Sequence, residues 1–482
     1  MKLKKLSTIA AVVGCAALAP LSAQEKEEAP KFTLIENVKI YDGHSDKLLA
    51  GKVLIEGNLI KDVGAGVKAP EGATVIDGKG GTLMPGLIDM HSHLVIHEGM
   101  LDGRDNLDQI AIGALTQEKL RDYLDQGFTT ARDAGGNTLG IAKAVRQGRI
   151  PGPRIYPSGG FMSQVGGHAD TGRWNDNIGD KDMLEKHEFG YIVSGRAQML
   201  EACRHNFRAG ATQIKIMAGG GVASEFDPLH ATQFTLDEFK AAVEVAEDYG
   251  SYCTIHAYHD RSVNRAIDAG VKCVEHNFLV SEETIKRMKK EGVALSVQAV
   301  MSIEAFGDPD SITFFSADQK SKAKKVNAGA IQMLKWALEH DVLMATGGDM
   351  FDKANANRQI DNMIILETIG YPAAKILEMG TGDAAEIISW CGEMNPYKDA
   401  YPDLSEEERA EKGIGLGVIE AGAYADILVV NGDPIADIKL LRDRDNLQLI
   451  MKDGDVWKNT LIPASHPQHV PSTKRHTPGG SL

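Results

Sequence analysis

The 482-residue sequence has only five cysteines, and no two of them form a CxxC motif. Cys15 lies close to the start, and the other four are scattered along the chain: Cys203, Cys253, Cys273 and Cys391. A chain of this length can bury a large core and does not need disulfides to fold. We therefore expect these four residues to be buried free thiols.

Basic residues are also scarce, with 52 Lys and Arg against 67 Asp and Glu, so the formal net charge is −15. An acidic surface repels phosphate backbones and anionic lipid headgroups, which argues against nucleic acid or a membrane surface as the main partner. Hydrophobic residues make up 43% of the chain and charged residues 25%, as in a soluble globular protein.

Long apolar runs are missing except at the very start, so we expect no membrane-spanning segment in the rest of the chain. Residues 1–23 combine three early lysines, an apolar run and small residues at the expected cleavage site. This pattern predicts a signal peptide and a periplasmic or secreted protein. Its removal would take away three lysines and leave a charge of −15 − 3 = −18. A second reading, ranked lower because the apolar run continues past Cys15, is lipoprotein cleavage with a lipid anchor on Cys15.

The two ends of the chain have the composition and residue pattern of β-sheet. Residues 31–84 and 414–462 contain short Val- and Ile-rich runs broken by Gly, Asp and Asn, and neither end is long enough for a core of its own. We predict that they combine into one small β-sandwich domain. Residues 397–413 read as a charged insertion, and residues 463–482 as a disordered tail.

Residues 85–396 follow a different pattern, in which short apolar strands alternate with amphipathic helices such as 235–249 and 322–340. Eight strands are expected, at LMPGLIDMHSHL, FTTARD, RIYPSG, TQIKIM, YCTIHA, KCVEH, VALSVQ and VLMATGGD. Eight strand–helix units predict an α/β fold of the (β/α)₈ TIM-barrel class. In such a barrel the chemistry lies at the carboxyl ends of the strands.

The first of these strands ends in His91 and His93. Residues two apart on a strand point to the same face, so both imidazoles could bind one metal ion. The alternative is a pair of histidines satisfied by ordinary hydrogen bonds, and HxH alone does not decide between the two.

Other strands end in polar residues too. Lys215 lies inside the apolar run IKIM, where burial would favour a neutral amine that can take up carbon dioxide as a carbamate. His256 and His276 end the next two strands, and Asp349 follows the last one. Each has an ordinary reading: a lysine paired with an acid, a structural histidine, or an aspartate that caps a helix. Because all of them would meet at one mouth of the barrel, a shared site is the better explanation.

With these strand-end residues, the chain resembles the amidohydrolase superfamily, in its binuclear subtype with a carboxylated lysine. The similar stretch runs from about Phe32 to Lys458 and includes LMPGLIDMHSH, GFTTARDAGG, GGHAD, QIKIMAGGGV, IHAY, VEH, TGGD and GVIEAGAYADILVVNGDP. The nearest branch contains imidazolonepropionase-like enzymes and Xaa-Pro and other Xaa dipeptidases. It also contains amidohydrolases that cleave N-acyl amino acids, including ochratoxin-type toxins.

The resemblance implies a complete site with two divalent metal ions, zinc being preferred for this set of nitrogen and oxygen ligands. Six residues would hold the ions: His91, His93, Lys215, His256, His276 and Asp349. Lys215, carboxylated on its amine, and a hydroxide would bridge them. Asp349 would act as general base and then acid, and His168 and Tyr258 would contact the substrate. His230 would line the entrance.

The implied reaction is hydrolysis of an amide C–N bond in a dipeptide or N-acyl amino acid, dipeptidase- or carboxypeptidase-like, by an enzyme that often assembles as a homo-oligomer. Asn277, His259 and the insertion depart from the branch and leave its substrate open. A deaminase or cyclic-amide hydrolase is the first alternative, although HAYHD lacks the glutamate of the deaminase HxxE motif. A non-catalytic binding protein is the second, although such members usually lack several ligands.

Overall fold

The computed structural model describes residues 31–97, 108–300, 303, 308–311, 315–350 and 358–461. The predicted signal peptide, the alternative lipid site at Cys15 and the tail at 463–482 lie outside these residues. Within the described part of the chain, no helix combines the length and the apolar character needed to cross a bilayer.

The two chain ends share one mixed eight-stranded sheet, as the sequence predicted. The amino-terminal strands are β1 (Phe32–Ile40), β2 (Leu49–Glu56), β3 (Leu59–Gly64), β4 (Thr74–Asp77) and β5 (Thr82–Pro85). The carboxyl-terminal strands are β16 (Ile427–Val430), β17 (Leu447–Lys452) and β18 (Asp455–Asn459). The order is β18-β17-β16-β5-β1-β2-β3, with β4 beside β1. The two ends meet where β16 pairs antiparallel with β5.

The central region forms two parallel sheets. One contains β6 (Leu87–Ser92), β7 (Phe128–Asp133) and β8 (Arg154–Pro157). The other has the order β10-β9-β11-β12-β13-β14-β15. Its strands are β9 (Phe161–Ser163), β10 (Gly190–Ile192), β11 (Ile214–Met217), β12 (Cys253–Ala257), β13 (Cys273–His276), β14 (Ala294–Val297) and β15 (Met344–Thr346). All eight expected strands are present, and the short β9 and β10 are additional.

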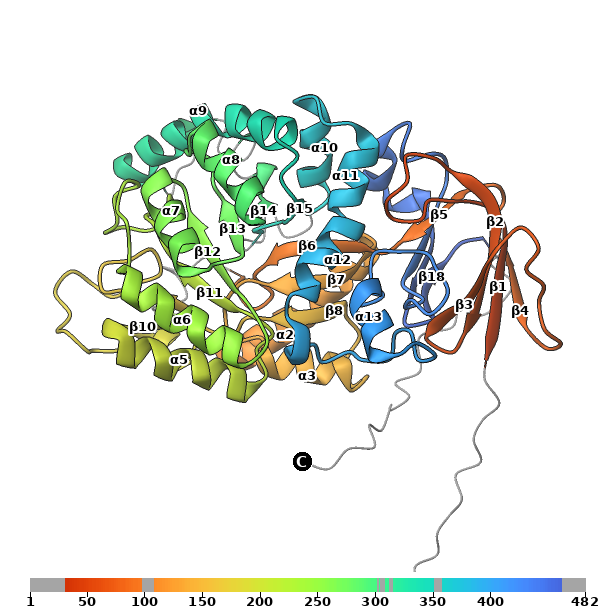
Figure 1. Cartoon of the computed structure of the whole chain (residues 1–482), viewed down its shortest axis with the longest axis horizontal. Helices are drawn as coiled ribbons and strands as arrows, with labels where there is room; N and C mark the ends of the chain where they lie inside the picture. Colours follow the sequence, from red (N-terminus) through yellow and green to blue (C-terminus); the bar gives the residue numbers. More distant parts are fainter. Residues whose placement is uncertain are drawn as a thin grey trace, which may run out of the picture.

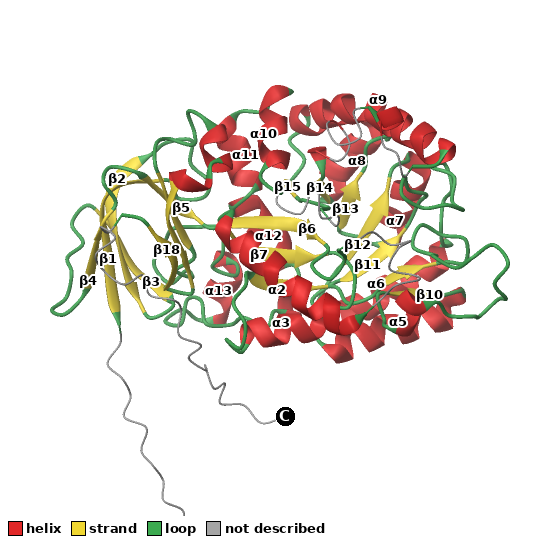
Figure 2. Ribbon diagram, turned by 180° about the vertical axis from the view of Figure 1, so that it is seen from behind, coloured by secondary structure: helices red, strands yellow, loops and turns green. Residues whose placement is uncertain are grey.

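Helices follow most of the parallel strands and cover these sheets from outside (Figures 1 and 2), and the last four helices follow one another after β15. They are α2 (Gln109–Asp125), α3 (Leu139–Arg146), α4 (Met183–Lys186), α5 (Gly195–Ala209), α6 (Leu236–Asp248), α7 (Asp260–Ala269), α8 (Glu282–Glu291), α9 (Ala317–Glu339), α10 (Asp361–Thr368), α11 (Ala373–Met379), α12 (Gly382–Ser389) and α13 (Glu406–Lys412). The helices expected at 235–249 and 322–340 correspond to α6 and α9. The start of α6 is fixed by a capping box between Thr235 and Glu238.

Backbone hydrogen bonds join both edge strands of the three-stranded sheet, β6 and β8, to segments next to β15 and β11 of the seven-stranded sheet. Near β8, the Thr212 amide donates to the carbonyl of Pro157 at 2.7 Å, and after β15 the Asp349 amide donates to the carbonyl of His91 at 2.7 Å. These contacts bring the carboxyl ends of the strands around one common mouth. The sequence of alternating strands and helices thus yields an α/β fold that collects the predicted polar residues at one end.

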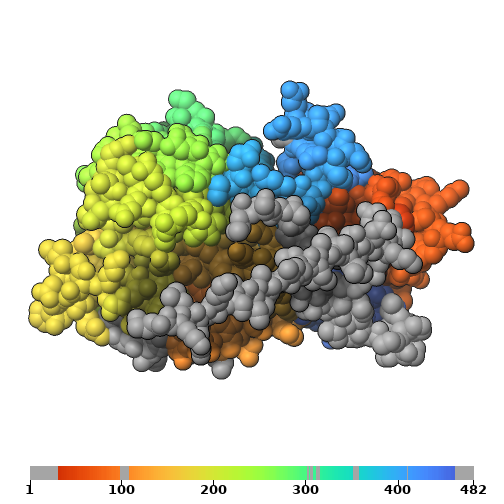
Figure 3. All heavy atoms as spheres, turned by 90° about the horizontal axis from the view of Figure 1, so that it is seen from below, coloured from red at the N-terminus to blue at the C-terminus, as the bar shows by residue number. Residues whose placement is uncertain are grey.

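The remaining predictions about packing concern the cysteines and the insertion. Cys203, Cys253, Cys273 and Cys391 are all free and buried, as expected. The segment 397–413 contains α13, but it is anchored, because its Tyr397 and Tyr401 are buried. In Figure 3 the amino-terminal strands lie at one end of the elongated molecule, and the yellow segment that precedes α5 lies at the other.

Candidate metal centre

A cavity of about 110 Å³ opens at the carboxyl ends of the parallel strands. Its polar lining includes all six predicted metal ligands together with His168 and Tyr258. Its apolar lining comes from Ile96, Phe161, Met217 and Val222, among others. The structure therefore gathers in one place the side chains that the sequence distributes over more than 250 positions, from His91 to Asp349.

His91, His93 and Asp349 form the tightest cluster in this cavity. One ligand atom from each of the three lies within 4.8 Å of the others. The Asp349 Oδ1 atom is 3.5 Å from Nε2 of His91 and 3.3 Å from Nε2 of His93. Two ring nitrogens and a carboxylate oxygen that converge in this way are a typical ligand set for Zn²⁺.

The position of Asp349 depends on a tight turn after β15. A Cβ atom added at Gly347 would lie 2.6 Å from Cβ of His91, so only glycine allows the turn to pack against β6. The next amide, of Gly348, donates to Oδ1 of the buried Asp89 at 2.8 Å. Asp349 itself has a φ of 55°, in the left-handed region of backbone conformation that residues other than glycine rarely adopt. This turn directs the Asp349 carboxylate toward the two histidines, and the helix α10 begins only at Asp361.

The charges in the cluster suit metal binding. Burial, with a smaller contribution from the Lys215 ammonium, lowers the pKa of His91 to about 4. Burial also lowers the pKa of His256 and His276 well below that of free histidine. Burial alone would raise the pKa of Asp349, but the neighbouring histidines hold it below its usual range. Neutral imidazoles and an ionised carboxylate are the forms that bind divalent cations.

Lys215 is the second residue of β11 and only 1% exposed. Burial is the main influence on its amine and lowers the pKa to about 8, although the carboxylates of Glu275 and Asp349 oppose this effect. A lysine with a lowered pKa carries a larger neutral fraction at physiological pH. The neutral amine is the form that reacts with carbon dioxide.

His256 and His276 occupy the ends of the adjacent strands β12 and β13. Their ring centroids are 4.6 Å apart, and the His276 ring is 5.0 Å from that of His91. Among the described residues, Nε2 of His256 is buried and has no hydrogen-bond partner. A buried nitrogen without a hydrogen-bond partner is energetically costly, so its natural partner is an ion or molecule bound in the cavity. His276 has a φ of 67°, another left-handed conformation at a strand end.

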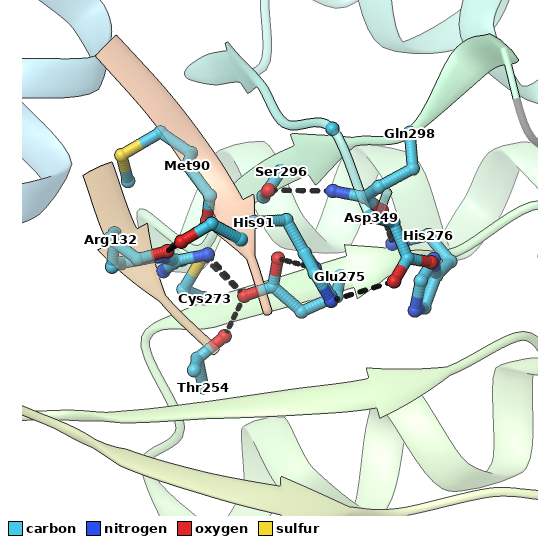
Figure 4. A network of polar contacts seen from close by, with 12 residues as sticks. Met90, His91, Arg132, Thr254, Cys273, Glu275, His276, Ser296, Gln298 and Asp349 are labelled. Carbon is cyan, nitrogen blue, oxygen red and sulfur yellow. Dashed lines mark hydrogen bonds and ion pairs between the residues drawn. The ribbon is translucent and has the colours of Figure 1, made fainter. Parts of the chain in front are cut away.

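A buried network around Glu275 supports this cluster beside His91 (Figure 4). The Glu275 carboxylate faces Nδ1 of His91 at 2.8 Å, and it also accepts hydrogen bonds from Arg132 and Thr254. Burial opposes the ionisation of Glu275, but Arg132, Lys215 and His91 together hold its pKa well below the usual range. A carboxylate on one ring nitrogen fixes the tautomer of the imidazole and leaves the other nitrogen for a metal.

His168 and Tyr258 contact the cluster from the side. The His168 ring stacks on that of His256, with centroids 3.9 Å apart and an interplanar angle of 14°. The Tyr258 ring lies 5.1 Å from that of His256 and 5.5 Å from that of His276. Burial raises the pKa of Tyr258, so its hydroxyl keeps its proton and can donate a hydrogen bond.

His230 is the predicted site residue that the structure does not bring into this cavity. It is exposed and is not part of the cavity lining. A turn closed by the Ala231 amide and the Pro228 carbonyl buries Leu229 and leaves His230 at the surface. The structure thus gives no role at the cavity to His230.

Four residues of the site were missed by the sequence reasoning. Glu275 and Arg132 are charged residues inside apolar strands, and that pattern could have revealed them. Ser224 and Asp227 lie in the loop after β11 and contact His168. No spacing in the sequence indicates that contact, because it joins two loops.

Known proteins resemble this chain over most of its length. An ochratoxinase of Aspergillus niger is 24% identical over 459 residues, which cover 92% of this chain and 90% of the relative. A solved prolidase complexed with N-methylphosphonate-L-proline superimposes with a TM-score of 0.79 at 29% identity, over 89% of this chain and 100% of that one. A 5′-deoxyadenosine deaminase of Methanococcoides burtonii is 23% identical over 385 residues, 72% of this chain and 77% of the relative. Residues 82–400 match the amidohydrolase family, and the chain belongs to that family.

Proposed function

We propose that this protein is a binuclear metal-dependent hydrolase that cleaves the amide bond of a dipeptide or an N-acyl amino acid. The observation that carries the proposal is the convergence of six ligand-type side chains on one cavity. The likeness to an ochratoxinase and a prolidase supports amide substrates, which we extend from those proteins to this one.

His91, His93 and Asp349 would hold one cation and His256 and His276 the other, with carboxylated Lys215 shared between them. The unpartnered Nε2 of His256 and the close approach of the other three ligands fit this assignment. The nitrogen and oxygen donors favour zinc. When bound, such ions supply an activated water and polarise the carbonyl of the substrate.

The residues of the chain have distinct tasks in the proposed reaction. Asp349, kept ionised by its histidine neighbours, takes a proton from the attacking water on its carboxylate and delivers it to the leaving amine. The Tyr258 hydroxyl donates a hydrogen bond to the carbonyl oxygen as negative charge develops there. Nδ1 of His168 contacts the Ser224 hydroxyl, so His168 presents its other ring nitrogen, Nε2, to the substrate beside His256.

The main alternative is deamination, suggested by the deaminase relative. The structure offers a specific observation against it. Asp260, the nearest acid after His256, begins α7 and accepts hydrogen bonds from the backbone amide and the hydroxyl of Ser281 at 2.8 and 2.9 Å. It is absent from the cavity lining, so it does not replace the glutamate of a deaminase.

We propose that the parallel strands form a closed (β/α)₈ barrel, supported by the hydrogen bonds from both edges of the three-stranded sheet, and that the mixed sheet forms a β-sandwich domain. We also propose export to the periplasm or outside the cell, on the basis of the signal-peptide pattern at residues 1–23. Assembly into a homo-oligomer is proposed from the resemblance alone.

A substrate panel tests the proposed function. Zinc-loaded mature protein would be assayed with dipeptides, N-acyl amino acids, cyclic amides and deoxyadenosine compounds. We expect free amino acid to be released from members of the first two groups. Release of ammonia from the deoxyadenosine compounds alone would favour a deaminase. Ring opening of the cyclic amides alone would favour a cyclic-amide hydrolase. Fewer than one metal ion per purified chain would support a non-catalytic protein.

A further inference from the structure

The loop between β11 and α6 forms a cradle around the His168 ring. The Ser224 hydroxyl lies 2.8 Å from Nδ1 of His168, and Oδ2 of Asp227 lies 3.4 Å from the same nitrogen. The stacked His256 ring covers one face of the imidazole. The ring is thus held along one edge by the loop and on one face by a predicted metal ligand.

The direction of the hydrogen bonds fixes the tautomer of the neutral ring. The Ser224 hydroxyl donates to the carbonyl of Gly221 at 3.2 Å, so its oxygen is left to accept a hydrogen bond from His168. The Asp227 carboxylate is also an acceptor. Nδ1 must therefore carry the proton, and Nε2 is the ring nitrogen that remains for the cavity.

Asp227 is placed for this task by contacts of its own. It is 1% exposed, and its Oδ2 atom accepts from the Gly221 amide at 2.8 Å and from the Gln233 side chain at 3.4 Å. Gln233 also accepts a hydrogen bond from the His168 backbone amide at 3.1 Å. The same small group of residues thus holds both the backbone and the ring of His168.

Gly221 supplies the space for the ring. A Cβ atom at this position would lie 1.9 Å from Cε1 and 2.1 Å from Nδ1 of His168. Gly221 does not have a left-handed backbone, and the three atoms nearest to the added Cβ all belong to the imidazole, so the strain of an alanine would come from that ring. The glycine and the histidine therefore form a matched pair.

We propose that Asp227 and Gly221 are positioning residues for His168, Asp227 by fixing its tautomer and orientation and Gly221 by leaving room for its ring. The role of His168 on the substrate rests on the proposed function, but the positioning itself does not. Asp227 never needs to touch the substrate in this account.

The first test is a double-mutant cycle on unfolding, which requires no substrate. Gly221→Ala should lower the urea midpoint in the wild-type background and leave it unchanged in the His168→Ala background, where the clashing ring is gone. An equal drop in both backgrounds would overturn the pairing. Because unfolding is measured without catalysis, this result is independent of whether the protein cleaves amides.

The second test uses activity on the best substrate of the panel. Asp227→Asn should lower kcat about 10–100-fold, because a neutral amide no longer enforces the tautomer, while the metal content stays at the wild-type level. The same substitution in His168→Ala should cause no further loss. Asp248→Asn, an exposed acid at the end of α6, is the matched control and should have no effect. Equal losses in both backgrounds would show that Asp227 acts through the fold instead of through His168.

Discussion

The two walls of the cavity are built in different ways. The strand wall consists of His91, Lys215, His256 and His276, which lie on β6, β11, β12 and β13. The loop wall presents His168 and Ser224 to the cavity, and Gly221 and Asp227 support them without lining it; all four lie in the segments after β9 and β11. Both walls place a carboxylate on Nδ1 of a histidine: Glu275 on His91 and Asp227 on His168.

The difference between the walls lies in what holds the carboxylate. Glu275 is part of a strand, is fully buried and is paired with the Arg132 guanidinium. Asp227 is held mainly by backbone and amide donors of its own loop. A charge-paired carboxylate in a strand is suited to fixing metal ligands, whereas a loop can change without disturbing them. We infer that the strand wall sets the chemistry and the loop wall adjusts the substrate contacts.

The largest effect should come from Asp349, whose carboxylate lies beside His91 and His276 of the strand wall. Asp349→Asn removes the group proposed to transfer the proton, so kcat should fall about 10²–10⁴-fold. Steady-state kinetics would be read together with metal content, and Asp268→Asn on the exposed face of α7 serves as the control. A variant with wild-type kcat would exclude Asp349 as the proton carrier.

The strand wall should depend strongly on Glu275. Glu275→Ala leaves the buried Arg132 guanidinium without its partner, and breaking such a pair costs about 3–5 kcal/mol of unfolding free energy. Chemical denaturation would measure this loss. Glu282→Ala on α8, an exposed acid paired with Lys286, should lower the free energy of unfolding far less. Equal effects of the two substitutions would contradict the view that the network holds the strand wall.

Acid should weaken the metal-free protein through the same wall. The pKa of His91 is about 4 in the folded chain, below the value of 6.5 for free histidine. Between these values the unfolded chain binds more protons, so stability is present above pH 6.5 and is lost as the pH falls toward 4. The shift corresponds to roughly 3 kcal/mol. Urea midpoints of the chelated protein from pH 7 to pH 4 would reveal the decline, and His91→Gln should make it shallower, with His256 and His276 causing the remainder. A His91→Gln variant with an unchanged profile would assign the effect elsewhere.

The smallest effect should come from Ser224. Ser224→Ala removes one hydrogen bond to His168 and leaves Asp227 as the remaining acceptor. The free energy of unfolding should therefore fall by only about 0.5–1.5 kcal/mol. KM and kcat should change by a few fold at most. A loss as large as that of Asp227→Asn would reverse the order of importance within the loop wall.

Much of the strand wall could be predicted from the sequence. A parallel strand buried on both faces is an apolar run, so the polar residue at its end stands out, as His91, Lys215 and His276 do. The eight strands and the joining of the two chain ends could be predicted for the same reason. Glu275 was within reach, because a charge inside such a run requires a partner.

The loop wall could not be predicted in the same way. The contact of Asp227 with His168 joins two loops that are 59 positions apart, since 227 − 168 = 59, and no periodicity connects them. His230 shows the same limit from the other side. It lies in the same loop as Asp227 and was expected at the entrance, but a local turn leaves it on the surface.

Metal analysis of the wild-type protein and of Lys215→Ala, purified in parallel with zinc, tests the central claim most directly. Mass spectrometry of the wild-type protein under native conditions would be run beside it to detect carbon dioxide bound to the lysine. We predict two metal ions per chain in the wild type, with the carbamate present. In Lys215→Ala we predict loss of at least one ion together with amide hydrolysis. Two bound ions and full activity in Lys215→Ala would contradict a metal centre bridged by this residue.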